Sequence, residues 1–275
     1  MGAGFAFHGL RDWRWPFWYS ERRVGRKSIH HLDITYTGIW NETPHNRNWI
    51  KLLRHTLDRA GLEKVGVVAA DDYEGGGWRI VEEMKSDPEL DAAVARVGVH
   101  YRSTQSTPAA RAVGCPLWSS EDGPWRGDWQ GAESLARTLN RNYIVGKFSK
   151  TEIWSPVTAY YDSLPLPGSG VLRANEPWSG HYEIQPATWA IAHTTQFAQP
   201  GWRYLDSACK MIDGGSVVAL QSPAVGSCEA FALVRVTNRG SFTPQGTPAY
   251  PLHMGSLILR QINGIGYLFE WMAMR

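Results

Sequence analysis

The stretch Val65-Gly66-Val67-Val68-Ala69-Ala70, followed directly by Asp71-Asp72, decides the fold class. An unbroken run of small and β-branched apolar residues is typical of a strand that is buried on both faces, as in a parallel sheet. Just before it, residues 47–60 carry apolar side chains at helical spacing, and Gly61 stands where a helix ends. The sequence therefore predicts a helix followed by a buried strand, which is the repeating unit of parallel α/β proteins.

The same alternation extends in both directions from this unit. Further strands are predicted at residues 33–40, 97–101, 116–120 and 153–154, and further helices around Trp78, after Pro88, over 132–143 and over 188–197. About five βα units are recognisable in this way, whereas a complete (β/α)8 barrel has eight. The pattern by itself leaves two folds open, an incomplete barrel or a different doubly wound α/β fold.

Beyond about residue 205 the helical pattern ends. Residues 214–220 and 230–236 are apolar and β-branched in the manner of antiparallel strands. We therefore place a domain boundary near Pro200-Gly201, with an α/β domain over residues 1–200 and an all-β segment over residues 201–275.

Composition excludes several function classes. Lys and Arg total 28 against 26 Asp and Glu, a formal net charge of +2, which does not suit a general nucleic-acid binder or a polybasic membrane patch. No apolar run approaches the roughly 18 residues of a transmembrane helix. Three widely spaced cysteines exclude a disulfide scaffold and a cysteine-based zinc site. No phosphate-binding glycine motif and no HExxH motif occurs, so we expect no cofactor and no metal.

Polar residues follow the predicted strands at matching positions. They are Asn41-Glu42, Asp71-Asp72, His100-Tyr101 and Glu121-Asp122. In parallel α/β proteins the functional groups collect at these strand ends. His100 is expected to form hydrogen bonds rather than to bind a metal. Asn41 and the hydroxyls of Ser119 or Ser120 are candidate donors to Glu121.

Glu42 and Glu121 stand out because each has a tryptophan shortly before it, Trp40 and Trp118. Two carboxyl groups that face one another are the machinery of glycoside hydrolysis, one as general acid and the other as nucleophile or base. A single glutamate after a strand is usually an ordinary loop residue, but two at matching strand ends are harder to dismiss. The 14 tryptophans fit either sugar-stacking walls or a tryptophan-rich core.

Four motifs occur in an order that resembles the galactocerebrosidase family, glycoside hydrolase family 59, over roughly residues 30–225. They are Gly38-Ile39-Trp40-Asn41-Glu42, Leu117-Trp118-Ser119-Ser120-Glu121-Asp122, Glu176-Pro177-Trp178-Ser179-Gly180-His181-Tyr182 and His193-Thr194-Thr195-Gln196-Phe197-Ala198-Gln199-Pro200-Gly201-Trp202. The resemblance implies a (β/α)8 barrel, here N-terminally incomplete over residues 1–200, and a partial β-sandwich over 201–275.

The resemblance also implies a retaining β-galactosidase that acts on galactosylceramide or another β-galactoside, a step of sphingolipid degradation. Its acid/base falls on Glu42 and its nucleophile on Glu121. Asn41 would hydrogen-bond the sugar, and Trp154 would supply an aromatic wall. A lipid-presenting activator protein is an implied partner, and a lysosomal or secreted location follows by family analogy.

Two alternatives stay open at this point. The family's first barrel strands and its sugar-contacting arginine have no recognisable counterpart, so the chain resembles the C-terminal part of a barrel. This motivates the first alternative to a β-galactosidase, a truncated, non-catalytic remnant that binds a galactolipid. The second is a related retaining glycosidase that acts on another β-linked sugar, because two carboxyl groups do not specify the substrate.

Overall fold

The computed structural model describes residues 31, 33–73, 76–101, 105–159, 163, 168–174, 176–196, 198–212 and 215–223, together with the course of three later strands. The chain forms two compact units. The first holds the described residues up to Asp122 and Lys147–Glu152, and the second holds Gly123–Gly146 and the described residues from Ile153 onward. Among the helices that the structure describes, none is long and apolar enough to cross a membrane.

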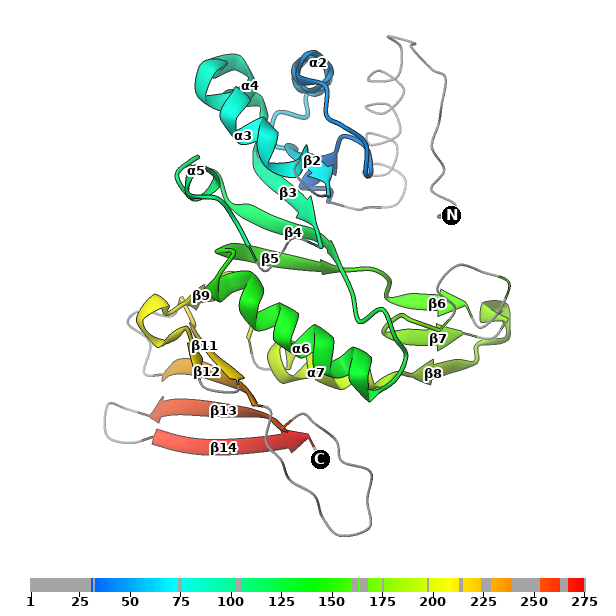
Figure 1. The fold of residues 1–275 in the computed structure, drawn as a ribbon, viewed down its shortest axis with the longest axis vertical. Helices are drawn as coiled ribbons and strands as arrows, with labels where there is room; N and C mark the ends of the chain where they lie inside the picture. Colours follow the sequence, from blue (N-terminus) through cyan, green and yellow to red (C-terminus); the bar gives the residue numbers. More distant parts are fainter. Residues whose placement is uncertain are drawn as a thin grey trace. The chain divides into compact units, whose positions relative to one another are not determined.

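The first unit is an α/β layer whose strands lie in the order of the sequence (Figure 1). Its elements are β1 (Tyr36–Gly38), α2 (Arg47–Arg59), β2 (Gly66–Asp72), α3 (Gly76–Ser86), α4 (Pro88–Ala93), β3 (Arg96–His100), α5 (Pro108–Arg111), β4 (Leu117–Asp122) and β5 (Phe148–Ile153). The sheet order is β1-β2-β3-β4-β5, and the first three pairs are parallel. Sequential parallel strands joined by helices are the arrangement of a (β/α) barrel wall.

The helix boundaries follow local signals that the sequence already contains. Asn46 caps α2 by accepting a hydrogen bond from the Trp49 N–H, and Gly61 just beyond the helix has a φ of +70°, which glycine adopts without strain. Asp87 caps α4 through the Leu90 N–H, and Pro88 occupies the first helical position. The strands predicted at 33–40, 65–70, 97–101 and 116–120 and the helices of this unit are confirmed, with ends that differ by a few residues. The strand predicted at 153–154 is in fact β5, which ends at Ile153 and leaves Trp154 outside.

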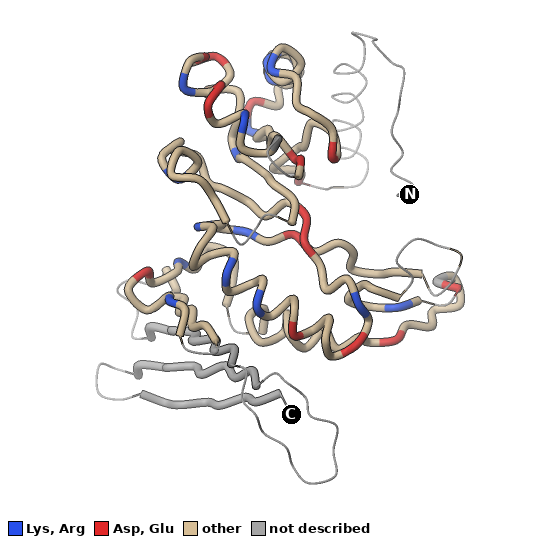
Figure 2. The backbone as a smooth tube through the Cα atoms, in the orientation of Figure 1, with Lys and Arg blue, Asp and Glu red and all other residues tan. Residues whose placement is uncertain are grey.

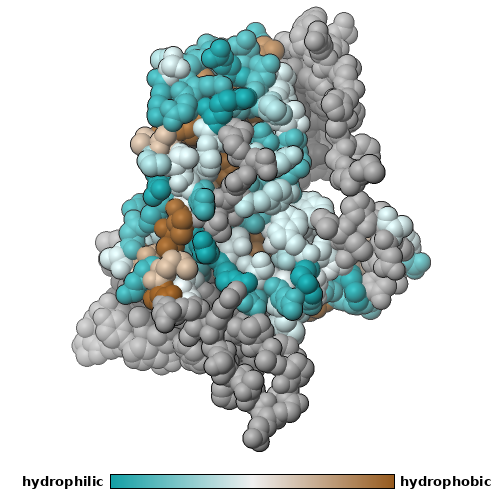
Figure 3. All heavy atoms as spheres, viewed as in Figure 1, coloured by the Kyte–Doolittle hydropathy of each residue, from teal (hydrophilic) through white to brown (hydrophobic). Residues whose placement is uncertain are grey.

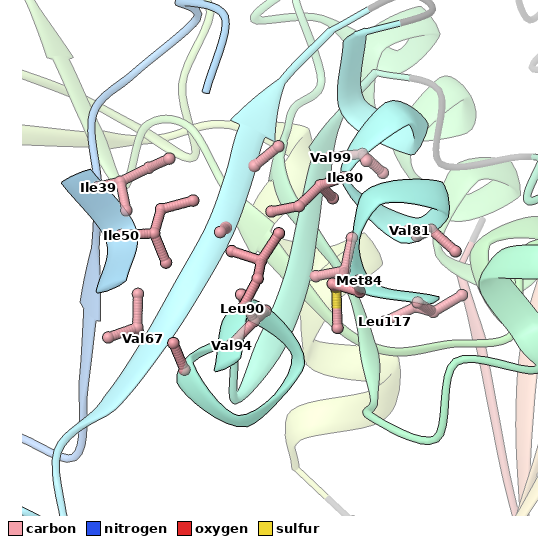
Figure 4. Packing of buried hydrophobic residues seen from close by; sticks show 14 of the residues in the cluster. Ile39, Ile50, Val67, Ile80, Val81, Met84, Leu90, Val94, Val99 and Leu117 are labelled. Atoms are coloured by element: carbon pink, nitrogen blue, oxygen red, sulfur yellow. The ribbon is translucent and has the colours of Figure 1, made fainter. Parts of the chain in front are cut away.

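The apolar core lies between the outer face of the sheet and the helices that cover it. Figure 4 shows Val67 of β2 and Val99 of β3 among Ile80 and Met84 of α3 and Leu90 of α4, and all five are buried. The outer surface of these helices is mainly hydrophilic in Figure 3, and Figure 2 shows basic and acidic residues interspersed along them. Because each helix has an apolar and a polar face, it packs its apolar face against the sheet.

The opposite, inner face of the sheet is aromatic and cationic. The rings of Tyr36 and Trp118 meet edge to face with centroids 4.7 Å apart. The Arg96 guanidinium lies 5.1 Å and 5.7 Å from the two ring centres, and the Lys150 ammonium lies 4.2 Å from that of Trp118. A hollow of about 410 Å³ opens on this face and is bordered by Tyr36, Trp118, Lys150 and Asp71. Cation–π contacts thus order the wall of the hollow.

Two irregularities interrupt the strand pairing near the C-terminal strand ends. Ala70 pairs with Gly98 but Asp72 pairs with Val99, so that Asp71 is an extra residue in β2. In the same way Val99 pairs with Ser119 and His100 with Glu121, so that β4 contains the extra residue Ser120. Bulges of this kind re-aim side chains and are frequent beside active sites.

Gly98 makes room for the second irregularity, and its replacement by alanine should therefore destabilise the first unit. A Cβ atom at Gly98 would lie 2.7 Å from Ser120 Oγ and 2.9 Å from Ser120 Cβ. We expect Gly98→Ala to lower the free energy of unfolding by roughly 1–3 kcal/mol, the usual cost of overpacking, as measured by chemical denaturation. Adding Ser120→Gly should recover part of the loss, and purely additive effects of the two changes would contradict the contact.

The described part of the second unit combines two α-helices and two short 3-10 helices with a six-stranded and a three-stranded sheet. Its elements are α6 (Trp129–Ile144), β6 (Val157–Ala159), β7 (Leu172–Ala174), η1 (Pro177–Ser179), β8 (Tyr182–Ile184), α7 (Pro186–Thr195), β9 (Arg203–Tyr204), η2 (Asp206–Ala208), β10 (Lys210–Ile212), β11 (Gly215–Gln221), β12 (Glu229–Asn238), β13 (His253–Ile262) and β14 (Tyr267–Met274). Strands β10 to β14 form an antiparallel sheet, with β9 added beside β11. The antiparallel pair predicted over 214–236 is confirmed, and the domain boundary near residue 200 stays a prediction.

The three-stranded sheet β6-β7-β8 was not predicted. Each of its strands has three residues, which is too short for an alternating pattern to be recognised.

Candidate active site

Four consecutive strand ends of the first unit bring Glu42, Asp71, His100, Tyr101 and Glu121 together. Backbone hydrogen bonds hold these ends in place. The Glu42 N–H donates to the Asp71 carbonyl at 3.0 Å, and the Tyr101 N–H donates to the Glu121 carbonyl at 3.2 Å. The cluster therefore lies where parallel α/β proteins carry their functional groups.

Three members of the cluster have left-handed backbone conformations. The φ angles are +48° at Glu42, +58° at Asp71 and +51° at Tyr101. Residues other than glycine seldom adopt such angles, and the conformation costs on the order of 1–3 kcal/mol unless the surroundings impose it. Strain concentrated at neighbouring strand ends is characteristic of a functional site.

His100 lies at the centre of the cluster, with its side chain only 1% exposed. Its Nδ1 atom is 3.2 Å from Glu42 Oε1, and its Nε2 atom is 3.1 Å from Asp71 Oδ1. A third carboxylate oxygen, Glu121 Oε2, is 3.9 Å from Nδ1. One buried imidazole is thus surrounded by three carboxyl groups.

Burial by itself lowers the pKa of His100, because a charged ring loses solvation. The hydrogen bond and charge of Asp71, the hydrogen bond of Glu42 and the charge of Glu121 outweigh this, so that the pKa of His100 is raised above its usual value. The protein therefore favours the protonated imidazole.

Tyr101 contacts the carboxylates from the other side. Its hydroxyl donates a hydrogen bond to Glu121 Oε1. Burial, and then the two glutamates, raise the pKa of Tyr101 well above its usual value. The phenol therefore stays a neutral hydrogen-bond donor that orients the Glu121 carboxyl group.

The two glutamates of the sequence analysis face one another across this cluster. Single atoms of Glu42, His100 and Glu121 all lie within 4.8 Å of each other. The glutamate side chains are 32% and 18% exposed, so a ligand can reach both. The structure thus brings together the carboxyl groups that the sequence singled out.

The same three residues have a spacing that could accept a metal ion. His100, however, already uses both ring nitrogens, Nδ1 towards Glu42 and Nε2 towards Asp71. A metal needs the lone pair of one of them. The hydrogen-bond network therefore accounts for the arrangement without assigning a metal to it.

The remaining candidates lie differently. Asn41 is exposed, and its backbone carbonyl accepts a hydrogen bond from the Thr43 hydroxyl. Trp154 belongs to the second unit, where it stacks on Trp125 with ring centres 6.0 Å apart. Sugar contacts by Asn41 and Trp154 stay predictions.

The expectation that serine hydroxyls support Glu121 is wrong. Ser119 Oγ donates to Asp122 Oδ2 at 2.8 Å, and Ser120 Oγ, displaced by the bulge, has no hydrogen-bond partner among the described residues. Tyr101 takes this role instead. Tyr101 and Asp71 were missed as members of the site, although both stood among the polar residues that follow the predicted strands.

A larger hollow of about 690 Å³ lies at the opposite ends of the strands. Charged side chains line it, including Lys51, Arg54 and Glu89, and most of them are already paired with one another or with backbone carbonyls. None of the clustered carboxylates lines it, so the candidate active site is the cluster at the other end of the sheet.

Comparisons with known proteins identify the family of the chain. The model of glycosyl hydrolase family 59 matches residues 15–196. A galactocerebrosidase of Danio rerio is 42% identical over 230 residues, which are 80% of this chain and 34% of that protein. The galactocerebrosidase of Homo sapiens is 44% identical over 221 residues, 80% of this chain and 32% of that protein. The chain thus spans about a third of the length of these relatives.

Solved structures agree in fold. SrfJ from Salmonella typhimurium has a TM-score of 0.67 at 14% identity, covering 91% of this chain and 61% of its own. A family 30 xylanase from Clostridium acetobutylicum has a TM-score of 0.59 at 15% identity, covering 94% and 65%. These neighbours are (β/α)8 proteins, which confirms an α/β fold of barrel type.

Proposed function

Because the chain belongs to glycosyl hydrolase family 59, we propose that it is a retaining β-galactosidase that hydrolyses galactosylceramide or related β-galactosides. The observation that supports this most directly is the proximity of Glu42 and Glu121, which bring carboxylate oxygens within 4.8 Å. Retaining glycosidases place their two carboxyl groups about 5–5.5 Å apart, whereas inverting ones leave about 6.5–9.5 Å for a water molecule.

In this proposal Glu42 is the acid/base and Glu121 is the nucleophile. Glu121 attacks the anomeric carbon while the proton of Glu42 passes to the departing glycosidic oxygen, so that a glycosyl–enzyme ester forms and the aglycone leaves as an alcohol. The Glu42 carboxylate then takes a proton from water, and the water oxygen displaces Glu121 from the sugar. The hydrogen bond from Tyr101 holds the Glu121 carboxyl group in place for the attack.

The galactoside part of the proposal rests on the relatives, which are named galactocerebrosidases. The carboxylate pair itself fits any β-linked sugar, so a retaining glycosidase on another sugar is the alternative within the same chemistry. A chain that binds a galactolipid without turning it over is the alternative outside it.

A 2,4-dinitrophenyl 2-deoxy-2-fluoro-β-galactoside tests the proposal. The fluorine slows both steps, but the good leaving group keeps formation of the ester fast, so the sugar accumulates on the nucleophile. We expect mass spectrometry of the intact chain to show one added fluorogalactosyl group, and peptide mapping to place it on Glu121. Labelling by the corresponding glucoside alone would favour another sugar, and binding without labelling or turnover would favour the non-catalytic alternative.

A further inference from the structure

Asp71 and His100 are neither the acid/base nor the nucleophile in this proposal. His100 nevertheless contacts Glu42, and Asp71 contacts His100. We propose that Asp71 and His100 form a positioning pair that holds one proton between His100 Nδ1 and the Glu42 carboxyl group. This inference rests on the proposed role of Glu42 as acid/base.

The contacts define the direction in which the pair acts. Asp71 Oδ1 is 3.1 Å from His100 Nε2, and a carboxylate there can accept only from an N–H at that nitrogen. The other nitrogen, Nδ1, is thereby directed at Glu42 Oε1, 3.2 Å away. Asp71 thus selects the ring orientation and the tautomer of His100, in the way that outer carboxylates orient functional histidines.

One proton can then reside either on His100 Nδ1 or on the Glu42 carboxyl group. In one state the protonated Glu42 carboxyl donates to a neutral Nδ1, and in the other an imidazolium donates to the Glu42 carboxylate. The two states contain the same atoms and the same net charge. The proton is therefore a property of the pair and not of either residue alone.

Other groups that face His100 act on the same proton. Glu121 Oε2 lies 3.9 Å from Nδ1, and the Tyr101 ring meets the imidazole edge to face at 5.4 Å between centres. The negative charges of Asp71 and Glu121 both make loss of the shared proton less favourable, in agreement with the raised pKa of His100. Without the Asp71 charge, the shared proton should therefore be lost at a lower pH. Glu42 then has no proton to donate above that pH.

Asp71→Asn removes this charge with little change in shape. Asparagine adopts the left-handed backbone of residue 71 more readily than most residues, and its amide oxygen can still accept from Nε2–H. The matched control is Asp72→Asn, one residue along the same strand, where the carboxylate accepts from the Tyr73 N–H instead.

The first readout is the titration of His100 by ¹⁵N NMR of histidine-labelled protein, with the signal assigned by its loss in His100→Gln. We expect Asp71→Asn to move the midpoint to lower pH by at least about one pH unit, as expected for an opposite charge in contact, and Asp72→Asn to move it much less. In wild type, neutral His100 should carry its proton on Nε2. An Nδ1–H tautomer, or an unchanged midpoint in Asp71→Asn, would overturn the inference.

Thermal unfolding supplies a readout that needs no turnover. Because the pKa of His100 is raised in the folded state, its stabilising contribution is complete below the unfolded pKa and is lost as the pH rises through the folded pKa. The unfolding midpoint of Asp71→Asn should therefore fall below that of wild type most strongly at acidic pH, and the difference should shrink as the pH rises. A difference that is constant with pH would contradict the pair.

The pH dependence of hydrolysis separates this inference from the proposed function. With a β-galactoside that has a poor leaving group, Asp71→Asn should shift the basic limb of kcat/KM to lower pH, and with a dinitrophenyl galactoside it should change little. A wild-type chain without turnover would remove the proposed function, whereas the NMR and unfolding readouts would still decide whether the proton is shared. Equal shifts for both substrates would show that Asp71 acts through the fold and not through Glu42.

Discussion

Replacement of Glu121 by alanine should abolish hydrolysis of every β-galactoside, with a loss of kcat of at least about 10⁴-fold. Removing a covalent nucleophile costs up to about 10⁶-fold in well-studied enzymes, because the remaining groups cannot form the intermediate. Tyr101 donates a hydrogen bond to this carboxylate, and the substitution also removes that hydrogen bond. The measurement is the initial rate of release of dinitrophenol from its β-galactoside.

Azide identifies the nucleophile in this variant. The alanine side chain leaves a space where a small anion attacks the anomeric carbon from the face that Glu121 occupied. The product should be the α-galactosyl azide, which NMR distinguishes from its β anomer. Glu82→Ala is the control, because Glu82 is an exposed glutamate on α3 that pairs with Lys85. Full activity in Glu121→Ala would exclude it as nucleophile.

Replacement of Glu42 by alanine should have an effect that depends on the leaving group. General acid catalysis contributes typically 10²–10⁴-fold, so hydrolysis of substrates with a poor leaving group should fall by about that factor. Dinitrophenol leaves without protonation, so formation of the ester should stay fast and only its hydrolysis should slow. The measurement is a burst of dinitrophenol followed by a slow steady rate.

Azide should again restore turnover in Glu42→Ala, but with the opposite stereochemistry. Here it attacks the glycosyl–Glu121 ester from the face on which water would have entered, and it gives the β-galactosyl azide. If Glu42→Ala yields the α product and Glu121→Ala the β product, the two roles are exchanged even though the fold and the cluster are as described.

Local sequence patterns were sufficient to predict the strands and helices that carry the site. The buried run at 65–70, the helix end at Gly61 and the start of α4 at Pro88 depend on residues within a few positions of one another, and each was recognised correctly. Parallel strands place their carboxyl ends at one edge of the sheet. The meeting of Glu42 and Glu121 therefore follows from the βα pattern together with their places after two strands.

Tertiary structure alone decided which neighbours these glutamates have. The bulges that displace Asp71 and Ser120 arise from the pairing of β2 with β3 and of β3 with β4, and a shift of one residue turns a side chain to the other face. That shift leaves the Ser120 hydroxyl without a hydrogen-bond partner in the described part of the chain. It also directs Asp71 at His100 and accompanies the contact of Tyr101 with Glu121. Periodicity along a single strand contains no information on register between strands, because register is set by contacts between residues far apart in the chain.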